Sequence, residues 1–271
     1  MSNVEINGRP ADVEDLHRVA TRNYGHFTAM QVRDGAVRGL ELHLKRLEGA
    51  SRELFGVPGG DRDRDRLRGF IRHAVRGERA ASVRVSVVPG AEEPSAPGAG
   101  GPSAPDVMVS VTAPVADEPG PALRVRTVAY ERELPHLKHL ATMGLVYQRR
   151  LAREAGFDDA LFVGRDGYLR EGSIWNVAFW DGEQVVWPEA AVLPGITMQL
   201  LQGASAKAGV PWSTRRLTTD DLPSLRAAAA TYSHCPAQPL AGIDDVPFPG
   251  DGAALTDALR AAWAEVPWDS I

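Results

Sequence analysis

The sequence predicts an α+β fold built as two lobes. The chain has 271 residues, of which 44% are hydrophobic, enough to bury a substantial core in one large domain or two smaller ones. Strand-like and helix-like segments alternate irregularly, without the repeating strand and helix of a doubly wound sheet. We predict a small N-terminal lobe at 1–113, a linker at 114–121 rich in proline and acidic residues, and a larger C-terminal lobe at 122–271.

The first lobe combines amphipathic helices with alternating, valine-rich strands. Strands are predicted near 4–6, 27–32, 82–88 and 107–113. Leucines at helical spacing predict a helix over 40–55, and a second helix is predicted at 61–79, with its DRDRDR run on a solvated face. Residues 89–105 are rich in Pro, Gly, Ala and Ser, which cannot build a core, so we predict a disordered hairpin tip there.

Short strands joined by glycine turns dominate the second lobe. The predicted strands are 123–130, 159–163, 167–171, 175–180, 184–188 and 227–233. The predicted helices are 139–155, 197–208 and 253–266.

Composition excludes several classes of protein. The formal net charge of −5 gives no general attraction to nucleic acid or to an anionic membrane. No apolar run approaches the ~20 residues of a membrane helix, and the N-terminal residues lack a signal-peptide pattern. Cys235 is the only cysteine, which excludes a disulfide framework and a thiolate metal cluster. We therefore expect a cytoplasmic protein without a metal site.

Lysine is scarce in this chain, and one lysine is well placed for chemistry. Only Lys45, Lys138 and Lys207 occur among 30 basic residues. Lysine can lose its proton and attack a carbonyl, whereas arginine stays protonated. Lys138 precedes a predicted helix, whose N-terminal dipole would lower its pKa. The alternative is an ordinary surface lysine.

Three further positions are candidates for ligand binding, each with a structural alternative. Glu171 ends a predicted strand, where it either faces a ligand nitrogen or is solvated. Thr197 lies in LPGIT at a helix start, where free N–H groups and the hydroxyl form an anion site or the threonine simply caps the helix. Arg46 lies beside the leucine stripe, where its head reaches an interior anion or extends to solvent. Ser233, His234 and Cys235 form a polar cluster, but adjacent residues on an extended chain point to opposite faces, which disfavours a Cys/His nucleophile pair.

The order of several motifs resembles one enzyme family. The motifs are NYGHFTAMQVRDG at 23–35, HLKRL at 43–47, VRVSVV at 83–88, LKHL at 137–140, AGFDDALFVGRDGYLREGSIWN at 155–176 and LPGIT at 193–197. In this order the chain resembles the class IV aminotransferases, the fold-type IV pyridoxal-phosphate (PLP) enzymes. That family contains branched-chain and D-amino-acid aminotransferases and aminodeoxychorismate lyases. The resemblance implies a two-lobed, D-amino-acid-aminotransferase-like architecture and PLP as the cofactor.

The resemblance implies a role for each motif. Lys138 is similar to the lysine that forms the internal aldimine and moves protons between substrate and cofactor. Glu171 is similar to the partner of the pyridine nitrogen, and Arg46 to the phosphate-binding arginine. The other implied cofactor-site residues are Ser173 and Asn176, beside the ring, and Ile196, Thr197 and Ser233, at the phosphate.

Phe27 and Thr28 are implied on the substrate side. Arg84 is a candidate for binding the substrate carboxylate, and Arg33 is a weaker one. The family also implies a homodimer whose active site gathers residues from both lobes.

The chain departs from the family pattern in three places. The turn before Phe27 is the compact Tyr24-Gly25-His26, and Ala141 stands where an asparagine is common. Ile174 and Trp175 replace small or polar residues, and Trp175 either narrows the pocket or packs in the core. These departures concern the substrate and not the cofactor.

Three functions remain open from the sequence. The favoured one is a PLP-dependent aminotransferase that moves an amino group between an amino acid and a 2-oxo acid. The second is a PLP-dependent 4-amino-4-deoxychorismate lyase that releases pyruvate and 4-aminobenzoate. The local sequence at Phe27-Thr28 and at 137–140 resembles that of such lyases. The third is a non-catalytic binding protein, which the presence of Lys138, Glu171 and Arg46 disfavours.

Overall fold

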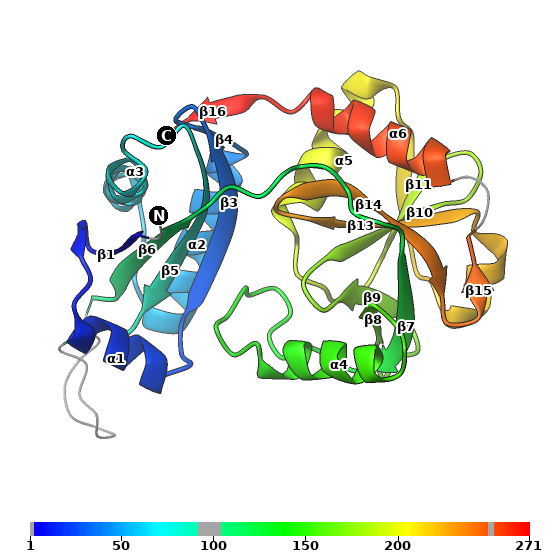
Figure 1. Ribbon diagram of the computed structural model, residues 1–271, viewed down its shortest axis with the longest axis horizontal. Helices are drawn as coiled ribbons and strands as arrows, with labels where there is room; N and C mark the ends of the chain where they lie inside the picture. Colours follow the sequence, from blue (N-terminus) through cyan, green and yellow to red (C-terminus); the bar gives the residue numbers. More distant parts are fainter. Residues whose placement is uncertain (1–2, 92–103, 249–251) are drawn as a thin grey trace. The chain divides into compact units, whose positions relative to one another are not determined.

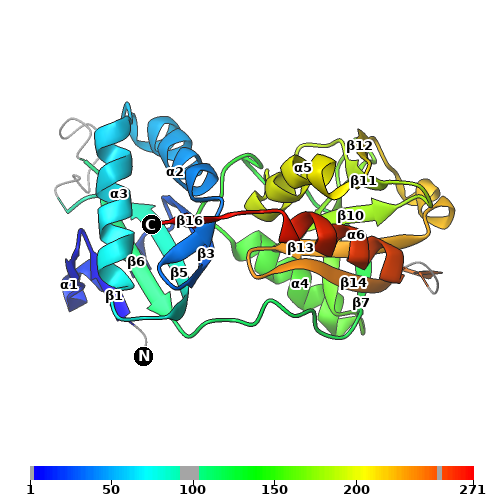
Figure 2. The same ribbon diagram turned by 90° about the horizontal axis from the view of Figure 1, so that it is seen from above.

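The computed structural model describes residues 3–91, 104–248 and 252–271. Contacts divide the chain into two compact units, each with helices and strands (Figures 1 and 2). The first unit contains Met1–Val115, Leu137–Ala141 and Trp268–Ile271, and the second contains Ala116–His136 and Thr142–Pro267. The predicted α+β class is confirmed. Most of the predicted hairpin tip, 92–103, lies outside the described residues.

The first unit is built on a mainly antiparallel sheet with strand order β16-β4-β3-β5-β6-β1-β2. Its strands are β1 (Asn3–Ile6), β2 (Arg9–Pro10), β3 (His26–Arg33), β4 (Ala36–Arg38), β5 (Ala80–Val88), β6 (Asp106–Thr112) and β16 (Trp268–Ser270). Its helices are α1 (Val13–Thr21), α2 (Leu40–Phe55) and α3 (Asp61–Ala74).

Only one face of this sheet packs against α2 and α3. Alternate residues such as Met30 of β3 and Val85 of β5 are buried in one cluster with Leu44 and Ile71 of the helices. Because side chains alternate along a strand, the residues between them project from the opposite face. That second face carries Phe27 and its cross-strand neighbours on β5.

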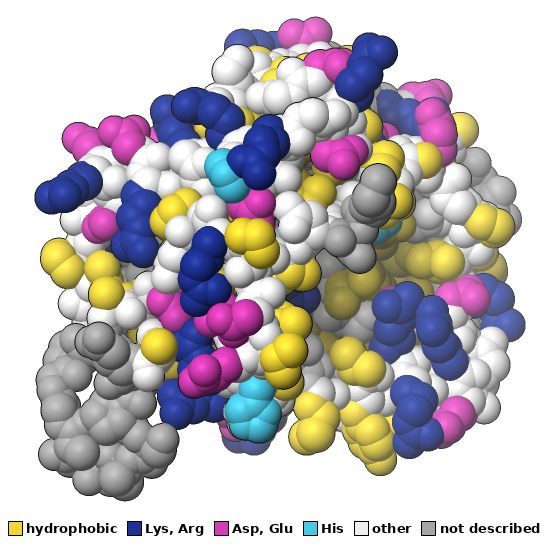
Figure 3. Space-filling model, turned by 60° about the vertical axis from the view of Figure 1, so that its left-hand side comes forward, with side chains coloured by type: hydrophobic (Ala, Val, Ile, Leu, Met, Phe, Trp, Pro, Cys, Tyr) yellow, Lys and Arg dark blue, Asp and Glu magenta, His cyan; other side chains and the backbone are white. Residues whose placement is uncertain are grey.

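The α3 helix carries the predicted solvated charges. Asp61 and Arg62 are exposed, whereas Arg64 donates to Glu48 of α2 at 2.6 and 2.9 Å. Figure 3 shows acidic and basic side chains interspersed over much of the face that it presents. The helix ends at Ala74, five residues before the predicted end, because a turn leads into β5.

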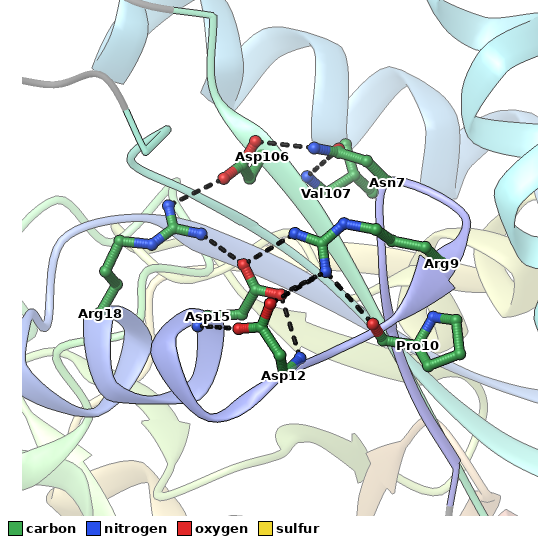
Figure 4. A network of polar contacts seen from close by, with 8 residues as sticks. All are labelled: Asn7, Arg9, Pro10, Asp12, Asp15, Arg18, Asp106 and Val107. Atoms are coloured by element: carbon green, nitrogen blue, oxygen red, sulfur yellow. Dashed lines mark hydrogen bonds and ion pairs between the residues drawn. The ribbon is translucent and has the colours of Figure 1, made fainter.

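Helix α1 docks through charged groups and was not predicted. Asp15 is 4% exposed and accepts two hydrogen bonds from Arg9, at 2.7 and 3.1 Å, and one from Arg18, at 2.7 Å (Figure 4). Arg18 also reaches Asp106 of β6 at 3.1 Å. The Arg9 hydrogen bond is the main cause that holds the pKa of Asp15 well below its usual range. The apolar Val13 is 84% exposed instead, so hydrophobic periodicity could not reveal this packing.

Residues 137–141 form an extended segment along β3, which corrects the predicted helix at 139–155. The Phe27 N–H donates to the Lys138 carbonyl at 2.9 Å, and the Leu140 N–H donates to the Gly25 carbonyl at 2.9 Å. Helix α4 (Met143–Glu154) begins only after Thr142. Lys138 therefore lies five residues before the first residue of the helix, on a segment that pairs with β3.

The second unit contains a sheet that closes on itself. Its strand order is β12-β11-β10-β13-β14-β7-β8-β9, and β9 also pairs with β10, which joins the ends of the path from β10 to β9. The strands are β7 (Leu123–Ala129), β8 (Asp159–Val163), β9 (Leu169–Gly172), β10 (Asn176–Trp180), β11 (Val185–Pro188), β12 (Trp212–Arg215), β13 (Ala227–Tyr232), β14 (Cys235–Ile243) and β15 (Val246–Pro247), the last paired with β14.

Helices cover the outside of this sheet. They are α4, α5 (Ile196–Ala208) and α6 (Gly252–Ala264). The short helix η1 (Thr219–Ser224) instead buries Leu222 in the cluster of the closed strands. Leu201 of α5 and Leu255 of α6 pack with Trp187 and Ala229 in one buried cluster, and both views show α5 and α6 near β13 (Figures 1 and 2). A second cluster, which includes Leu161, Leu169 and Phe179, contains residues of the closed strands.

Within residues 3–91, 104–248 and 252–271, no helix is long and apolar enough to cross a membrane. The same residues contain no group of three His, Cys, Asp or Glu side chains that would hold a metal ion.

Candidate active site

Lys138 lies on the helix-free face of the first unit's sheet. Its Nζ is 5.1 Å from the centroid of the Phe27 ring. The Arg84 guanidinium lies over the same ring at 3.6 Å and also donates from Nε to Ser86 Oγ at 3.3 Å. Desolvation lowers the pKa of Arg84 from its usual value. The structure thus brings Lys138, Phe27 and Arg84 together around one aromatic ring, where the ring's π electrons favour both cations.

Thr28 points to the other face of the same strand. Its hydroxyl lies 2.6 Å from His43 Nδ1 of α2, and both residues are buried. Neighbouring residues of a strand face opposite ways, so the structure does not place the Thr28 hydroxyl beside Phe27. Thr28 joins β3 to α2 instead.

The buried His43 shows where positive charge gathers in the first unit. Burial, as the main cause, and the charges of Arg46 and Lys138, as smaller causes, together lower the pKa of His43 to about 3. His43 is therefore neutral near pH 7. Arg46 and Lys138 both lie close enough to this imidazole to act on it electrostatically.

In the second unit, Glu171 and Asn176 lie opposite each other where β9 pairs with β10. Both are buried, Glu171 at 5% and Asn176 at 6% exposure. Glu171 Oε2 accepts a hydrogen bond from the Leu193 N–H at 3.1 Å, and Asn176 Nδ2 donates to the Leu193 carbonyl at 2.9 Å. Two buried hydrogen bonds therefore join the EGSIWN segment to the LPGIT segment.

The LPGIT segment leads directly into α5. Helix α5 begins at Ile196 with Gly195 as its N-cap, so the alternative in which Thr197 caps the helix is wrong. The buried Thr197 hydroxyl donates to the Tyr232 carbonyl at 3.1 Å. Backbone N–H groups in the first turn of a helix lack an intrahelical partner, and those of Ile196 and Thr197 have the direction needed to bind an anion.

The turn between β9 and β10 contains a buried serine and a buried tryptophan. Ser173 Oγ is buried and has no hydrogen-bond partner among the residues that the structure describes. Trp175 is 4% exposed and donates from Nε1 to Asp159 Oδ2 at 3.0 Å. A Cβ on Gly172 would lie 1.9 Å from the indole ring. Trp175 therefore packs in the core, which decides between the two expectations for this residue.

Residues 25–241 match the family model described as amino-transferase class IV. The chain belongs to the class IV aminotransferase family. No curated protein shows significant sequence similarity to this family member.

Solved structures show the same fold as this class IV enzyme. The fold IV-transaminase CpuTA1 from Curtobacterium pusillum is 25% identical with a TM-score of 0.79, covering 96% of this chain and 98% of its own. The branched-chain amino acid aminotransferase from T.th., complexed with N-(5'-phosphopyridoxyl)-L-glutamate, is 23% identical with a TM-score of 0.80, covering 97% and 92%. A putative 4-amino-4-deoxychorismate lyase from Legionella pneumophila is 17% identical with a TM-score of 0.80, covering 92% and 93%.

Two predicted site residues of this class IV enzyme, Arg84 and Ser233, are exposed, whereas the others are buried or half-buried. Ser233 is exposed in the turn between β13 and β14, next to His234, whose ring lies 4.6 Å from that of Tyr232. Cys235 is buried, and burial raises the pKa of its thiol. A raised pKa keeps the sulfur protonated, so the cysteine is unsuited to act as a nucleophile.

Sequence reasoning missed Arg132 and the backbone of Leu193. Burial lowers the pKa of Arg132, and the Glu171 charge opposes that effect, so the two charges interact. Arg132 lies in the mixed-charge run YERELP, which gives no signal of a buried role. No side-chain pattern indicates the Leu193 backbone groups, because every residue but proline carries both.

Proposed function

We propose that this enzyme is a PLP-dependent aminotransferase that moves an amino group between an amino acid and a 2-oxo acid. The observation that carries the proposal is that Lys138, Glu171 and Arg46 are all present in a member of the class IV family. The branched-chain aminotransferase relative, whose ligand joins a phosphopyridoxyl group to L-glutamate, supports both the cofactor and the class of substrate.

The described residues fit PLP, which carries a phosphate, a ring nitrogen and an aldehyde. The positive charges of Arg46 and Lys138 around neutral His43 suit an anionic ligand. The buried Ser173 Oγ has no partner within the described chain, and a buried hydroxyl of this kind is expected to meet a ligand or water. We propose that Glu171 binds the ring nitrogen and that Arg46, Ile196, Thr197 and Ser233 bind the phosphate.

The proposed roles follow from the chemistry of each side chain. When bound, PLP holds the amino group covalently and accepts electrons from the substrate Cα. Lys138 Nζ attaches the cofactor and then carries a proton to and from the substrate Cα. The Glu171 carboxylate keeps a proton on the ring nitrogen. Asn176 and Ser173 shape the turn beside the ring.

Substrate binding is assigned to the helix-free face of the first unit. Arg84 has a guanidinium fork suited to a carboxylate, and its contact with Phe27 fixes its direction beside Lys138. We propose Arg84 as the carboxylate-binding residue and Phe27 as the apolar wall next to it. Arg33 is a weaker candidate, since its Nη2 donates to the Val115 carbonyl at 2.7 Å.

The lyase is kept as a second candidate because of a specific observation. The local sequence is more similar to that of aminodeoxychorismate lyases at two places, Leu137–Leu140 and Phe27-Thr28. The putative lyase from Legionella pneumophila has the same TM-score as the branched-chain aminotransferase relative, so the fold does not favour either reaction.

The visible spectrum of the purified protein tests the proposal. A yellow absorption band that an amino acid bleaches and a 2-oxo acid restores is the expected result, because the two half-reactions then take place in one site. A band that no amino acid bleaches would favour the lyase, and aminodeoxychorismate would be the next substrate to try. Absence of a band after PLP is added would overturn both proposals.

The family also leads us to propose a homodimer. Light scattering coupled to size-exclusion chromatography tests it, with twice the 29.2 kDa chain mass as the expected value.

A further inference from the structure

Both polar backbone groups of Leu193 are held by side chains from one pair of strands. Glu171 takes the N–H and Asn176 takes the carbonyl, at 3.1 and 2.9 Å. Glu171, Asn176 and Leu193 are all buried. A change of the backbone angles φ and ψ at Leu193 would leave a buried donor or a buried acceptor unsatisfied, which is unfavourable. The two side chains therefore fix the direction of the chain at Leu193.

This fixed residue lies two positions before the N-cap of α5. Pro194 restricts the next φ angle, and Gly195 then packs directly on Asn176. A Cβ on Gly195 would lie 2.0 Å from Asn176 Oδ1. Asn176 thus contacts the segment before α5 twice: it donates a hydrogen bond to the Leu193 carbonyl, and it packs against the Gly195 backbone. The position of the first turn of α5 depends on this one amide.

We propose that Asn176 is a positioning residue that holds the first turn of α5 at a set distance from the Glu171 carboxylate. The inference rests on the proposed function, in which Glu171 binds the ring nitrogen and the first turn of α5 binds the phosphate. In PLP the ring nitrogen and the phosphate are linked through the ring and a short CH2–O arm, which limits the length between them. Two binding groups joined by buried hydrogen bonds select for that length, so the chain prefers PLP over pyridoxal, which lacks the phosphate.

The amide is required at this position for two reasons. An aspartate would bring an acceptor oxygen toward the Leu193 carbonyl and a second negative charge opposite Glu171, and like charges directly opposite in a sheet are unfavourable. A leucine would keep the volume but lose the donor to a buried carbonyl. Asn176→Asp and Asn176→Leu therefore remove the same hydrogen bond by different means.

The test is titration of the full chain with PLP and, separately, with pyridoxal, monitored by the visible absorption of the bound aldehyde. In both Asn176 variants we expect the affinity for PLP to fall by about tenfold or more, the equivalent of one buried hydrogen bond. The affinity for pyridoxal should change little, because Glu171 and Lys138 remain. The preference for PLP over pyridoxal is thus the quantity that should fall.

Trp175→Phe is the matched control. It removes the neighbouring buried hydrogen bond to Asp159 and leaves the groups around Leu193 untouched. We expect a lower Tm and an unchanged preference for PLP. An equal fall of the preference in Trp175→Phe would mean that general loosening is responsible, and the proposal would be wrong.

A further variant perturbs Asn176 through its neighbour Gly195 instead of changing Asn176 itself. Gly195→Ala forces Asn176 Oδ1 away from α5 and should lower the same preference, even if the Asn176 variants do not fold. An unchanged preference in the folded Asn176 or Gly195 variants would overturn the inference while leaving the proposed function in place. Failure of the wild-type chain to bind PLP would instead overturn the proposed function.

Discussion

Gly25 allows the segment that carries Lys138 to pair with β3, and a methyl group there should weaken this pairing. Gly25 has φ +134°, and a Cβ would lie 2.4 Å from the Val87 carbonyl oxygen of β5 and 3.0 Å from the Leu140 side chain. The carbonyl belongs to the backbone of a central strand, so it cannot move aside as a flexible side chain would. Gly25→Ala must therefore shift β3 away from β5 or away from residues 137–141.

The magnitude follows from two contributions. A residue other than glycine in a sparsely populated backbone region costs about 1–3 kcal/mol. Loss of the hydrogen bond from the Leu140 N–H to the Gly25 carbonyl adds about 0.5–1.5 kcal/mol. We expect the local opening free energy of 137–141 to fall by about 1.5–4.5 kcal/mol, which corresponds to roughly 10- to 2000-fold faster amide exchange.

Hydrogen exchange measured by mass spectrometry on a peptide that contains 137–141 is the assay. Gly35→Ala is the matched control, since Gly35 also has a positive φ, +73°, but no atom lies within 4 Å of its added Cβ. That control should lose about 1–2 kcal/mol from backbone strain and leave exchange at 137–141 unchanged. If residues 137–141 exchange their amide hydrogens as slowly in Gly25→Ala as in the wild type, the claim that this glycine supports the Lys138 segment is refuted.

Three further predictions concern single side chains. Lys138→Ala should abolish covalent capture of PLP by borohydride and lower turnover by about 10²–10⁴-fold, measured by mass spectrometry and steady-state kinetics; undiminished turnover would remove Lys138 from the mechanism. Glu171→Gln should keep PLP bound, because an amide oxygen still accepts from the Leu193 N–H, yet lose most of its turnover; an unchanged rate would exclude its electronic role. Asp15→Asn should lower the free energy of unfolding measured in urea at pH 7, because the pKa of Asp15 is lowered in the folded state. The stability that the Asp15 carboxylate contributes is present above the unfolded pKa near 3.9 and is lost as the pH falls below it. The difference between Asp15→Asn and wild type should therefore shrink toward pH 2, and a constant difference would contradict the ion-pair account.

Local pattern predicted most elements of the fold. The helix predicted at 40–55 has the bounds of α2, and the alternating strand predicted at 82–88 lies within β5. These elements bury one apolar face each, which periodicity detects. Helix α1 was missed because its inward side chains, Asp15 and Arg18, are charged.

Strand β14 was missed for a different reason. It contains Pro236 and Pro239, which argue against a central strand, yet it lies between β13 and β7. The start of α4 was misplaced because residues 138–140 pair with β3, more than a hundred residues earlier in the chain. Contacts over such separations leave no local pattern.

In the candidate site, too, local sequence predicted some features, and others depend on contacts between distant parts of the chain. The order of motifs singled out Lys138, Glu171 and Arg46, and the structure places each in a buried or half-buried position. The sequence analysis placed Phe27 and Thr28 together on the substrate side, whereas in the structure the Thr28 hydroxyl lies against His43 on the other face of the strand. The hydrogen bonds at Leu193 depend on strands that meet only in the folded chain.

The pairing of 137–141 with β3 also has a consequence for the order of folding during synthesis. A ribosome makes about 5–20 residues per second, so β3 waits for several seconds before residues 137–141 exist. The same side of β3 is completed later still, because β16 pairs with β4 and Arg72 binds the Ile271 carbonyl. Until then the nascent sheet has unpaired backbone edges, which are open to pairing with other chains. The first unit is thus begun first but completed last, and Lys138 reaches its position only after the chain has returned to a sheet that was made much earlier.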